Sequence, residues 1–312
     1  MHRRRILVLD GRRTALRSEA RPAPAHACID NWYVSDCNCE NLLSPFSPSR
    51  VECLQKEEHL ETYRCSIIVP CFNEESRLRL DLFSGFLQSE KNIHFLFVND
   101  GSTDGTLRLL RQFELQNPER VSVLDKPVNA GKAEAVRDGM RQAMLDDKPD
   151  YVGFWDADLA TPLAAILELL RQFSTNPAIE MVFGARIRLL GRKVNRNPLR
   201  HYLGRVFASA VSIMLRLPIY DTQCGAKIFR VTPELSEVLG APFHSRWIFD
   251  VEILARFEAL RKGDVSYLEN TVYEYPLPEW NDVRGSKVTS GAFLRATFEL
   301  FGIWRRYLAR KF

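Results

Sequence analysis

Short runs of apolar, β-branched and aromatic residues recur along the chain from residue 65 onward, and polar residues follow each run. Runs of four to six such residues bounded by turn-forming residues are typical of strands buried on both faces. Pro70 is expected to end the first of them. The pattern predicts strands at 65–69, 93–98, 121–124, 151–155 and 181–183.

Between these runs the apolar residues recur at helical spacing. One predicted helix buries Ala133, Val136, Met140, Ala143 and Met144. A second buries Leu163, Ile166, Leu167, Leu170 and Phe173. Thr161 is expected to cap the second helix, with Pro162 at its first position. Alternating strands and helices predict an α/β fold, with a mostly parallel central sheet covered by helices on both faces.

Residues 1–64 show neither helical nor alternating periodicity, and they contain proline-rich turn clusters. We expect a loosely ordered extension there, followed by one domain over 65–290 and a basic C-terminal helix over 291–312. The arginine-rich start lacks the apolar segment of a secretory signal. The longest apolar run, 206–215, has ten residues, whereas a membrane-spanning helix needs about 20.

The composition, 46% hydrophobic and 26% charged, is that of a globular protein, and the net charge of +4 is too small to favour nucleic acid as a partner. Seven cysteines without paired CxxC spacing argue against a disulfide framework and for a reducing compartment.

The positive charge is concentrated at the end of the chain, where one acid, Glu299, faces five basic residues: Arg295, Arg305, Arg306, Arg310 and Lys311. Apolar residues alternate with them: Phe293, Leu294, Phe298, Phe301, Trp304 and Leu308. This combination predicts an interfacial helix on an anionic membrane surface, with a core-packed helix as the alternative. The 199–217 segment is a candidate second apolar surface.

Polar residues follow three of the predicted strands, at 70–75, 99–105 and 156–158. Because carboxyl ends of parallel strands share one edge, where such sheets bind ligands, these residues are expected to converge. Glu74 and Asp104 have a second interpretation, as acids at helix starts. Asp156 and Asp158 form a DxD whose carboxylates point the same way, an arrangement that favours a cation between them. Oxygen ligands of this kind suit Mg²⁺ or Mn²⁺.

Asn129–Lys132 is a turn that opens a helix, where backbone N–H groups and Lys132 could face a phosphate. An ordinary glycine turn with a solvated lysine is the alternative. No GxGxxG follows the first strand and no GxxxxGK[ST] occurs, which removes the main signals of dinucleotide oxidoreductases and P-loop NTPases.

In order, the segments PCFNEE, VNDGSTDGT, NAGK and DAD resemble those of the GT-A glycosyltransferases of family 2. The later segments DTQCG, RWIFDVE and GSK are similar to those of polyprenyl-phosphate sugar transferases, closest to the dolichyl-phosphate β-glucosyltransferase branch. The resemblance covers about residues 65–308. Two departures matter: Ala160 stands where mannose-specific relatives often have Gln, and the QxxRW of processive synthases is absent, which disfavours chain elongation.

The resemblance implies a role for individual residues. The nucleoside would be bound by Pro70, Phe72, Glu74 and Asp100. Asp156 and Asp158 would hold the metal on the diphosphate, while Arg186 and Arg200 would meet the acceptor phosphate, joined by Lys287. Lys132 and Gln223 complete the expected substrate-binding set, and Asp250 is favoured over Glu252 as the acid that faces the site.

These residue types suit glycosyl transfer from a nucleotide diphosphate. A divalent cation stabilises charge on the departing diphosphate, and a lipid phosphate is already anionic, so it needs no strong general base. Arginine pairs bidentately with phosphate. The resemblance further implies an inverting displacement that gives a β-linked product.

The sequence therefore predicts an enzyme that moves one hexose, glucose from UDP-glucose, onto a dolichyl or undecaprenyl phosphate, as a peripheral protein at the cytoplasmic face of a membrane. Three alternatives remain open: mannosyl transfer from GDP-mannose, a saccharide hydroxyl as acceptor with Asp250 as general base, and a nucleotide-sugar-binding module without turnover.

Overall fold

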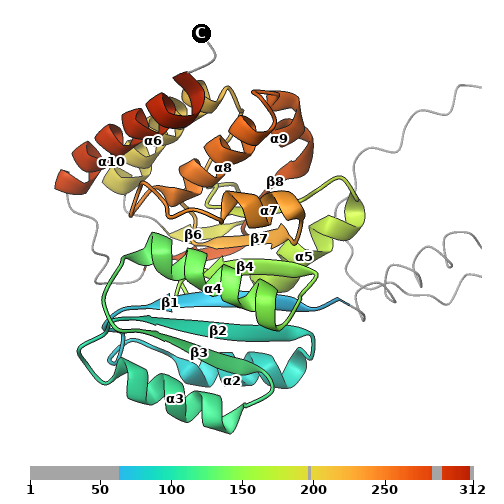
Figure 1. Ribbon diagram of the computed structural model, residues 1–312, viewed down its shortest axis with the longest axis vertical. Helices are drawn as coiled ribbons and strands as arrows, with labels where there is room; N and C mark the ends of the chain where they lie inside the picture. Colours follow the sequence, from blue (N-terminus) through green and yellow to red (C-terminus); the bar gives the residue numbers. More distant parts are fainter. Residues whose placement is uncertain (1–62, 196–197, 283–289, 310–312) are drawn as a thin grey trace, which may run out of the picture. The chain divides into compact units, whose positions relative to one another are not determined.

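The computed structural model describes residues 63–195, 198–282 and 290–309; the expectations for 1–62, Lys287, Arg310 and Lys311 lie outside them. A seven-stranded sheet with the order β3-β2-β1-β4-β7-β5-β8 forms its centre (Figure 1). Its strands are β1 (Cys65–Cys71), β2 (Ile93–Asp100), β3 (Val121–Lys126), β4 (Tyr151–Trp155), β5 (Met181–Ala185), β7 (Ala226–Arg230) and β8 (Val272–Pro276).

The sheet is mostly parallel, as predicted. β1 runs parallel to β2 and β4, β2 to β3, and β5 to β8, whereas β7 lies antiparallel between β4 and β5. A separate parallel pair joins β6 (Lys193–Asn195) to β9 (Glu279–Asn281).

Helices cover both faces of the sheet. Alternate residues of β1 show this, because Ile68 belongs to one hydrophobic cluster while Ile67 and Val69 belong to the other. One face carries α2 (Leu80–Ser89), α3 (Thr106–Gln116) and α5 (Ala165–Thr175). The other carries α4 (Lys132–Asp146), α6 (Pro198–Leu215), α8 (Phe249–Leu260) and α10 (Ser290–Ile303). The short helices are α7 (Pro233–Val238), α9 (Val265–Thr271) and the π-helical turn η2 (Trp304–Leu308).

Two predicted boundaries were wrong. Pro70 does not end β1, which continues in register with β2 to Cys71. The pairing of β1 with β4 stops at Ile68, so one side of β1 has no ladder at Pro70 for the missing N–H to interrupt.

The predicted cap of α5 was also wrong, since this helix begins at Ala165 without a side-chain cap. Thr161 is buried, and its carbonyl accepts a hydrogen bond from Trp155 Nε1 at 2.8 Å. The segment after Thr161 forms a tight turn, with Ala165 N donating to the Pro162 carbonyl. By contrast, α4 buries the predicted face at Ala133, Val136, Met140 and Ala143.

The last helix packs on the core with one face and exposes apolar side chains on the other. α10 and η2 pack against α8 through Ala296, Leu300, Ile303 and Leu308 (Figure 1). The outward face of α10 exposes Phe298 (77%) and Phe301 (61%). α6 likewise buries Phe207 while it exposes Val206 and Ile213. Within the described ranges, no helix is both long enough and apolar enough to cross a bilayer.

Candidate active site

The polar segments that follow β1 and β2 are joined by hydrogen bonds, which confirms that they converge at the carboxyl edge of the sheet. Asn73 N donates to Ser102 Oγ at 3.0 Å, and Thr103 N donates back to Asn73 Oδ1 at 2.8 Å. Glu74 N donates to Thr106 Oγ1 at 2.8 Å, at the start of α3. The two loops therefore form one preassembled rim.

The residues expected to bind the nucleoside lie along this rim. Pro70 is the second-last residue of strand β1, and Phe72 and Glu74 lie just after the strand; all three are partly buried. Glu74 forms an ion pair with Arg77 at 2.6 Å. Its side chain is therefore held in place by its own loop.

Asp100, the fourth of these residues, is buried at the end of β2 and serves the neighbouring turn. Its carboxylate accepts hydrogen bonds from the N–H groups of Ala130 (2.9 Å) and Gly131 (2.8 Å), and Lys126 Nζ lies 3.7 Å away. The amides that were expected to face a phosphate thus donate to Asp100. Gly131 has a φ of +95°, a conformation that favours glycine.

This turn places Lys132, the first residue of α4, against the carboxylates that follow β4. Lys132 Nζ forms an ion pair with Asp156 Oδ1. Burial opposes the charge on Lys132, but the carboxylates of Asp156 and Asp250 outweigh it and raise its pKa. Burial, together with the charge of Asp156, raises the pKa of Asp158. Asp158 therefore carries a negative charge that the protein compensates only in part.

The described residues contain no group of three or more His, Cys, Asp or Glu side chains placed to hold a metal. Asp156 and Asp158 nevertheless fit Mg²⁺ or Mn²⁺, because these ions use one or two carboxylates and take their other ligands from substrate phosphates and water. The raised pKa of Asp158 supports this fit, since a bound cation would relieve the charge that burial disfavours.

The DTQCG segment packs beneath the Asp156–Asp158 pair. Asp156 N donates to the Gly225 carbonyl at 3.0 Å. A Cβ on Gly225 would lie 1.9 Å from Asp156 Oδ2, so only glycine allows this approach. Gln223 Nε2 is buried and has no hydrogen-bond partner among the residues that the structure describes. The expected role of Gln223 in substrate binding stays a prediction.

Asp250 lies near the same pair, in an ion pair that sequence reasoning missed. Lys227 Nζ is 2.7 Å from Asp250 Oδ1, and Lys227 is fully buried. The ammonium also donates to the Cys224 carbonyl at 2.5 Å and lies over the Phe154 and Phe183 rings. Burial raises the pKa of Asp250 despite this lysine. The burial of Lys227 could not be predicted, because a lysine within a short apolar segment normally indicates an exposed position.

Arg186, at the end of β5, already pairs with a carboxylate. Its Nε and Nη2 donate to Asp221 at 2.6 and 2.8 Å, and its guanidinium lies 5.4 Å from the Trp280 ring. The guanidinium N–H groups that could bind an acceptor phosphate bidentately are therefore already paired with Asp221. Arg200 lies in the first turn of α6, and its side chain and Lys287 are outside the described part.

Comparison with known proteins shows which family the chain is similar to. A family model described as Glycosyl transferase family 2 matches residues 66–234. The dolichyl-phosphate beta-glucosyltransferase ALG5C of Trichomonas vaginalis is 32% identical over 251 residues, which cover 76% of this chain and 70% of that protein. The dolichyl-phosphate beta-glucosyltransferase of Saccharomyces cerevisiae is 30% identical and covers 75% and 72%.

Solved structures show the same fold at low identity. Mannosyl-3-phosphoglycerate synthase from Rubrobacter xylanophilus aligns with a TM-score of 0.59 at 14% identity, covering 82% of this chain and 77% of that one. Glucosyl-3-phosphoglycerate synthase from Mycobacterium tuberculosis, in complex with Mn²⁺, UDP-glucose and phosphoglyceric acid, aligns at 0.54 and 17%, covering 80% and 83%.

The sheet topology and these alignments define a glycosyltransferase of the GT-A fold, a hexosyltransferase. This chain belongs to glycosyl transferase family 2. The resemblance drawn from its motifs is confirmed at this level.

Proposed function

We propose that this protein transfers glucose from UDP-glucose to dolichyl phosphate with inversion at the anomeric carbon. The bond from that carbon to the UDP oxygen breaks, a bond to the lipid phosphate oxygen forms, and UDP leaves. The observation that carries the proposal is the Asp156–Asp158 pair, placed between Lys132 and the DTQCG segment at the carboxyl edge of β4. Relatives named for this reaction support the choice of sugar and lipid.

On the donor side, Asp156 and Asp158 would hold Mg²⁺ or Mn²⁺, which supplies Lewis-acid stabilisation of the departing diphosphate. The Mn²⁺ and UDP-glucose in the mycobacterial structure support this type of donor complex. Pro70, Phe72 and Glu74 line the nucleoside site at the end of β1. Asp100 acts indirectly, by fixing the turn that presents Lys132.

On the acceptor side, a phosphate oxygen needs no deprotonation near neutral pH, so positioning replaces base catalysis. The pairing of Asp250 with the buried Lys227 supports this interpretation, because the ion pair occupies the carboxylate that a hydroxyl acceptor would need as its base. The saccharide-hydroxyl alternative is less well supported for that reason.

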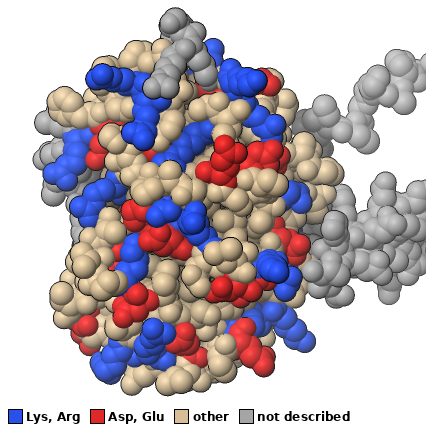
Figure 2. Space-filling view, in the orientation of Figure 1, with Lys and Arg blue, Asp and Glu red and all other residues tan. Residues whose placement is uncertain are grey.

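The lipid acceptor requires contact with a membrane, and α6 and α10 offer a surface for it. Phe298 and Phe301 are exposed on α10, and Ile213 is 78% exposed on α6. Arg295, Arg305 and Arg306 are exposed near them. Figure 2 shows basic side chains at the upper edge of the face drawn, near α10 of Figure 1, and mixed signs over the rest. We place this surface on an anionic leaflet, at the cytoplasmic face.

A transfer assay tests the proposal. Purified protein is incubated with labelled UDP-glucose or GDP-mannose, with dolichyl or undecaprenyl phosphate, and with Mn²⁺ or EDTA, and label in the organic phase is counted. Label from UDP-glucose that depends on dolichyl phosphate and on the metal supports the proposal. Label from GDP-mannose instead establishes the mannosyl alternative, and label that stays in water with every donor removes the lipid acceptor.

A further inference from the structure

A short segment between α7 and α8, residues 244–248, carries an exposed arginine beside the candidate site. Arg246 Nη2 donates to Asn129 Oδ1 at 3.3 Å. A Cβ on Gly131 would lie 2.9 Å from Arg246 Nε, so the guanidinium lies against the turn that leads into Lys132. Since Lys132 pairs with Asp156, Arg246 is at the rim of the proposed metal site.

A buried glutamate of α8 holds the backbone at the start of the 244–248 segment. Glu252, fully buried on α8, accepts hydrogen bonds from the N–H groups of His244 (3.0 Å) and Ser245 (2.9 Å). Arg256 neutralises Glu252 at 2.7 Å. Ser245 Oγ in turn accepts from Ile248 N at 2.7 Å.

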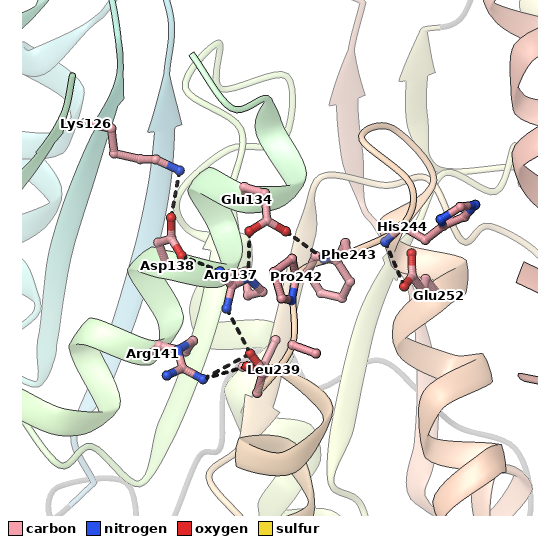
Figure 3. Close-up of polar contacts among 12 residues, drawn as sticks. Lys126, Glu134, Arg137, Asp138, Arg141, Leu239, Pro242, Phe243, His244 and Glu252 are labelled. Atoms are coloured by element: carbon pink, nitrogen blue, oxygen red, sulfur yellow. Dashed lines mark hydrogen bonds and ion pairs between the residues drawn. The ribbon is translucent and has the colours of Figure 1, made fainter. Parts of the chain in front are cut away.

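α4 holds the residues that lead into this segment, as Figure 3 shows. Glu134 accepts a hydrogen bond from Phe243 N at 2.7 Å, and Arg137 and Arg141 donate to the Leu239 carbonyl at 3.3 Å. The backbone that carries Arg246 is therefore fixed between α4 and α8, which keeps its side chain at one place on the rim.

The same segment touches the helix that exposes apolar side chains. Ser245 Oγ donates to Glu299 Oε2 of α10 at 2.5 Å, and the His244 ring approaches Gly302. Glu299 is adjacent to the exposed Phe298, and Trp247, next to Arg246, is itself 43% exposed. The segment that carries Arg246 thus contacts α10 through Ser245 and the turn before Lys132 through Arg246 itself.

We infer that Arg246 binds the phosphate of the lipid acceptor, an assignment that rests on the proposed function. The Nε and Nη2 groups of Arg186 both donate to Asp221. Arg246, by contrast, is exposed, and among the described residues its guanidinium makes one long hydrogen bond, to the amide oxygen of Asn129. A guanidinium in that state can donate two hydrogen bonds to a phosphate without breaking a buried ion pair. A phosphate there would have its prenyl chain beside Trp247 and α10.

The test compares R246A, R246K and the parent, with dolichyl phosphate in detergent and with farnesyl phosphate, which bypasses membrane binding. R246A is expected to raise the KM for both phosphates by at least about tenfold, the range for a lost charge-assisted hydrogen bond. The KM for UDP-glucose and Mn²⁺-dependent UDP binding stay at the parent values. R246K restores part of the acceptor KM, because it keeps the charge but not the fork.

R171A is the matched control: Arg171 is an exposed, ion-paired arginine on α5, and its removal leaves both KM values unchanged. A parent-like acceptor KM in R246A overturns the inference, as does a loss of UDP binding, which would place Arg246 on the donor. Absence of any lipid-linked product from the parent overturns the proposed function instead.

Discussion

The carboxyl edge of the sheet and the outer surface of α6 and α10 are built in opposite ways. At the edge, polar groups from distant loops bond to one another: Asp100 to the amides of its neighbouring turn, and Lys132 to Asp156. On α6 and α10, apolar side chains such as Ile213 and Phe298 are left exposed.

Under the proposed function, this difference would let one domain serve two unlike substrates. A charged, water-soluble donor is matched by preassembled charges, which lose little entropy on binding. A lipid acceptor would be matched by the apolar surface, whose contribution scales with the area removed from water. Changes at the edge should therefore affect chemistry and folding, and changes on the helices should affect membrane binding.

The largest expected effect comes from the ion pair beneath the edge. Lys227→Met leaves Asp250 buried and unpaired, so it should cost about 3–5 kcal/mol of unfolding free energy, measured by urea denaturation. Lys132→Met is the comparison, because the Lys132–Asp156 pair is partly exposed, with side-chain exposures of 32% and 37%. It should cost no more than about 1 kcal/mol. Equal losses would contradict the distinction between the two pairs.

The loss in Lys227→Met should also depend on pH. Burial raises the pKa of Asp250 above its unfolded value. Its protonated form therefore favours the folded state below the ordinary carboxyl pKa, and this contribution is lost as the pH rises through the raised value. Urea midpoints measured from pH 4 to 8 should show the variant approaching the parent at the acid end. A loss that is constant with pH would show that Asp250 is not the group left unpaired.

The next effect is on the chemistry at the edge. Asp156→Asn should lower kcat/KM for transfer by about 10²–10³-fold, because several kcal/mol of transition-state stabilisation depend on the cation. Asp146→Asn, at an exposed position on α4, should leave the rate unchanged. A variant at Asp156 that folds and keeps more than a tenth of the parent rate would break the account of the donor side.

On the other region, the double variant Phe298→Glu, Phe301→Glu should reduce binding to anionic vesicles about tenfold or more, since two apolar side chains no longer enter the membrane surface. Leu115→Glu, at an 80% exposed position on α3, is the control and should bind as the parent does. Cosedimentation with vesicles measures both. Equal binding of the double variant and the parent would remove α10 from the membrane contact.

The smallest effect concerns the interior below the edge. Burial raises the pKa of the Cys224 thiol to about 11. Iodoacetamide at pH 8 should therefore leave Cys224 unmodified in the native protein and alkylate it in urea, as peptide mass spectrometry can measure. Rapid native alkylation would show that the DTQCG segment opens.

The sequence was sufficient for strands β1 to β5 and for the side chains that gather at their ends, because both depend on local patterns. The buried face of α4 follows from the periodicity of its apolar residues. The ion pair between Lys132 and Asp156 was not predicted, because the sequence suggested a phosphate for Lys132 and a metal for Asp156. β7 was missed, since Lys227 interrupts its apolar run while the fold buries that lysine beside Asp250.

Contacts between segments that are distant in the sequence could not be predicted. Nothing near Arg186 indicates that Asp221, 35 residues away, fills its fork. Thr161 is a residue type that often caps helices, but here its carbonyl accepts a hydrogen bond from the Trp155 indole. The chain makes a further turn before α5 begins at Ala165. Such choices are decided by tertiary packing, which single-residue preferences do not encode.

The claim that Asp156 and Asp158 hold a cation against the donor diphosphate is tested most directly by calorimetric titration of UDP-glucose. The parent should bind the donor in Mn²⁺ and lose most of that affinity in EDTA, while the folded double variant Asp156→Asn, Asp158→Asn should bind weakly and equally in both. Tight, Mn²⁺-dependent binding by the double variant would contradict the claim.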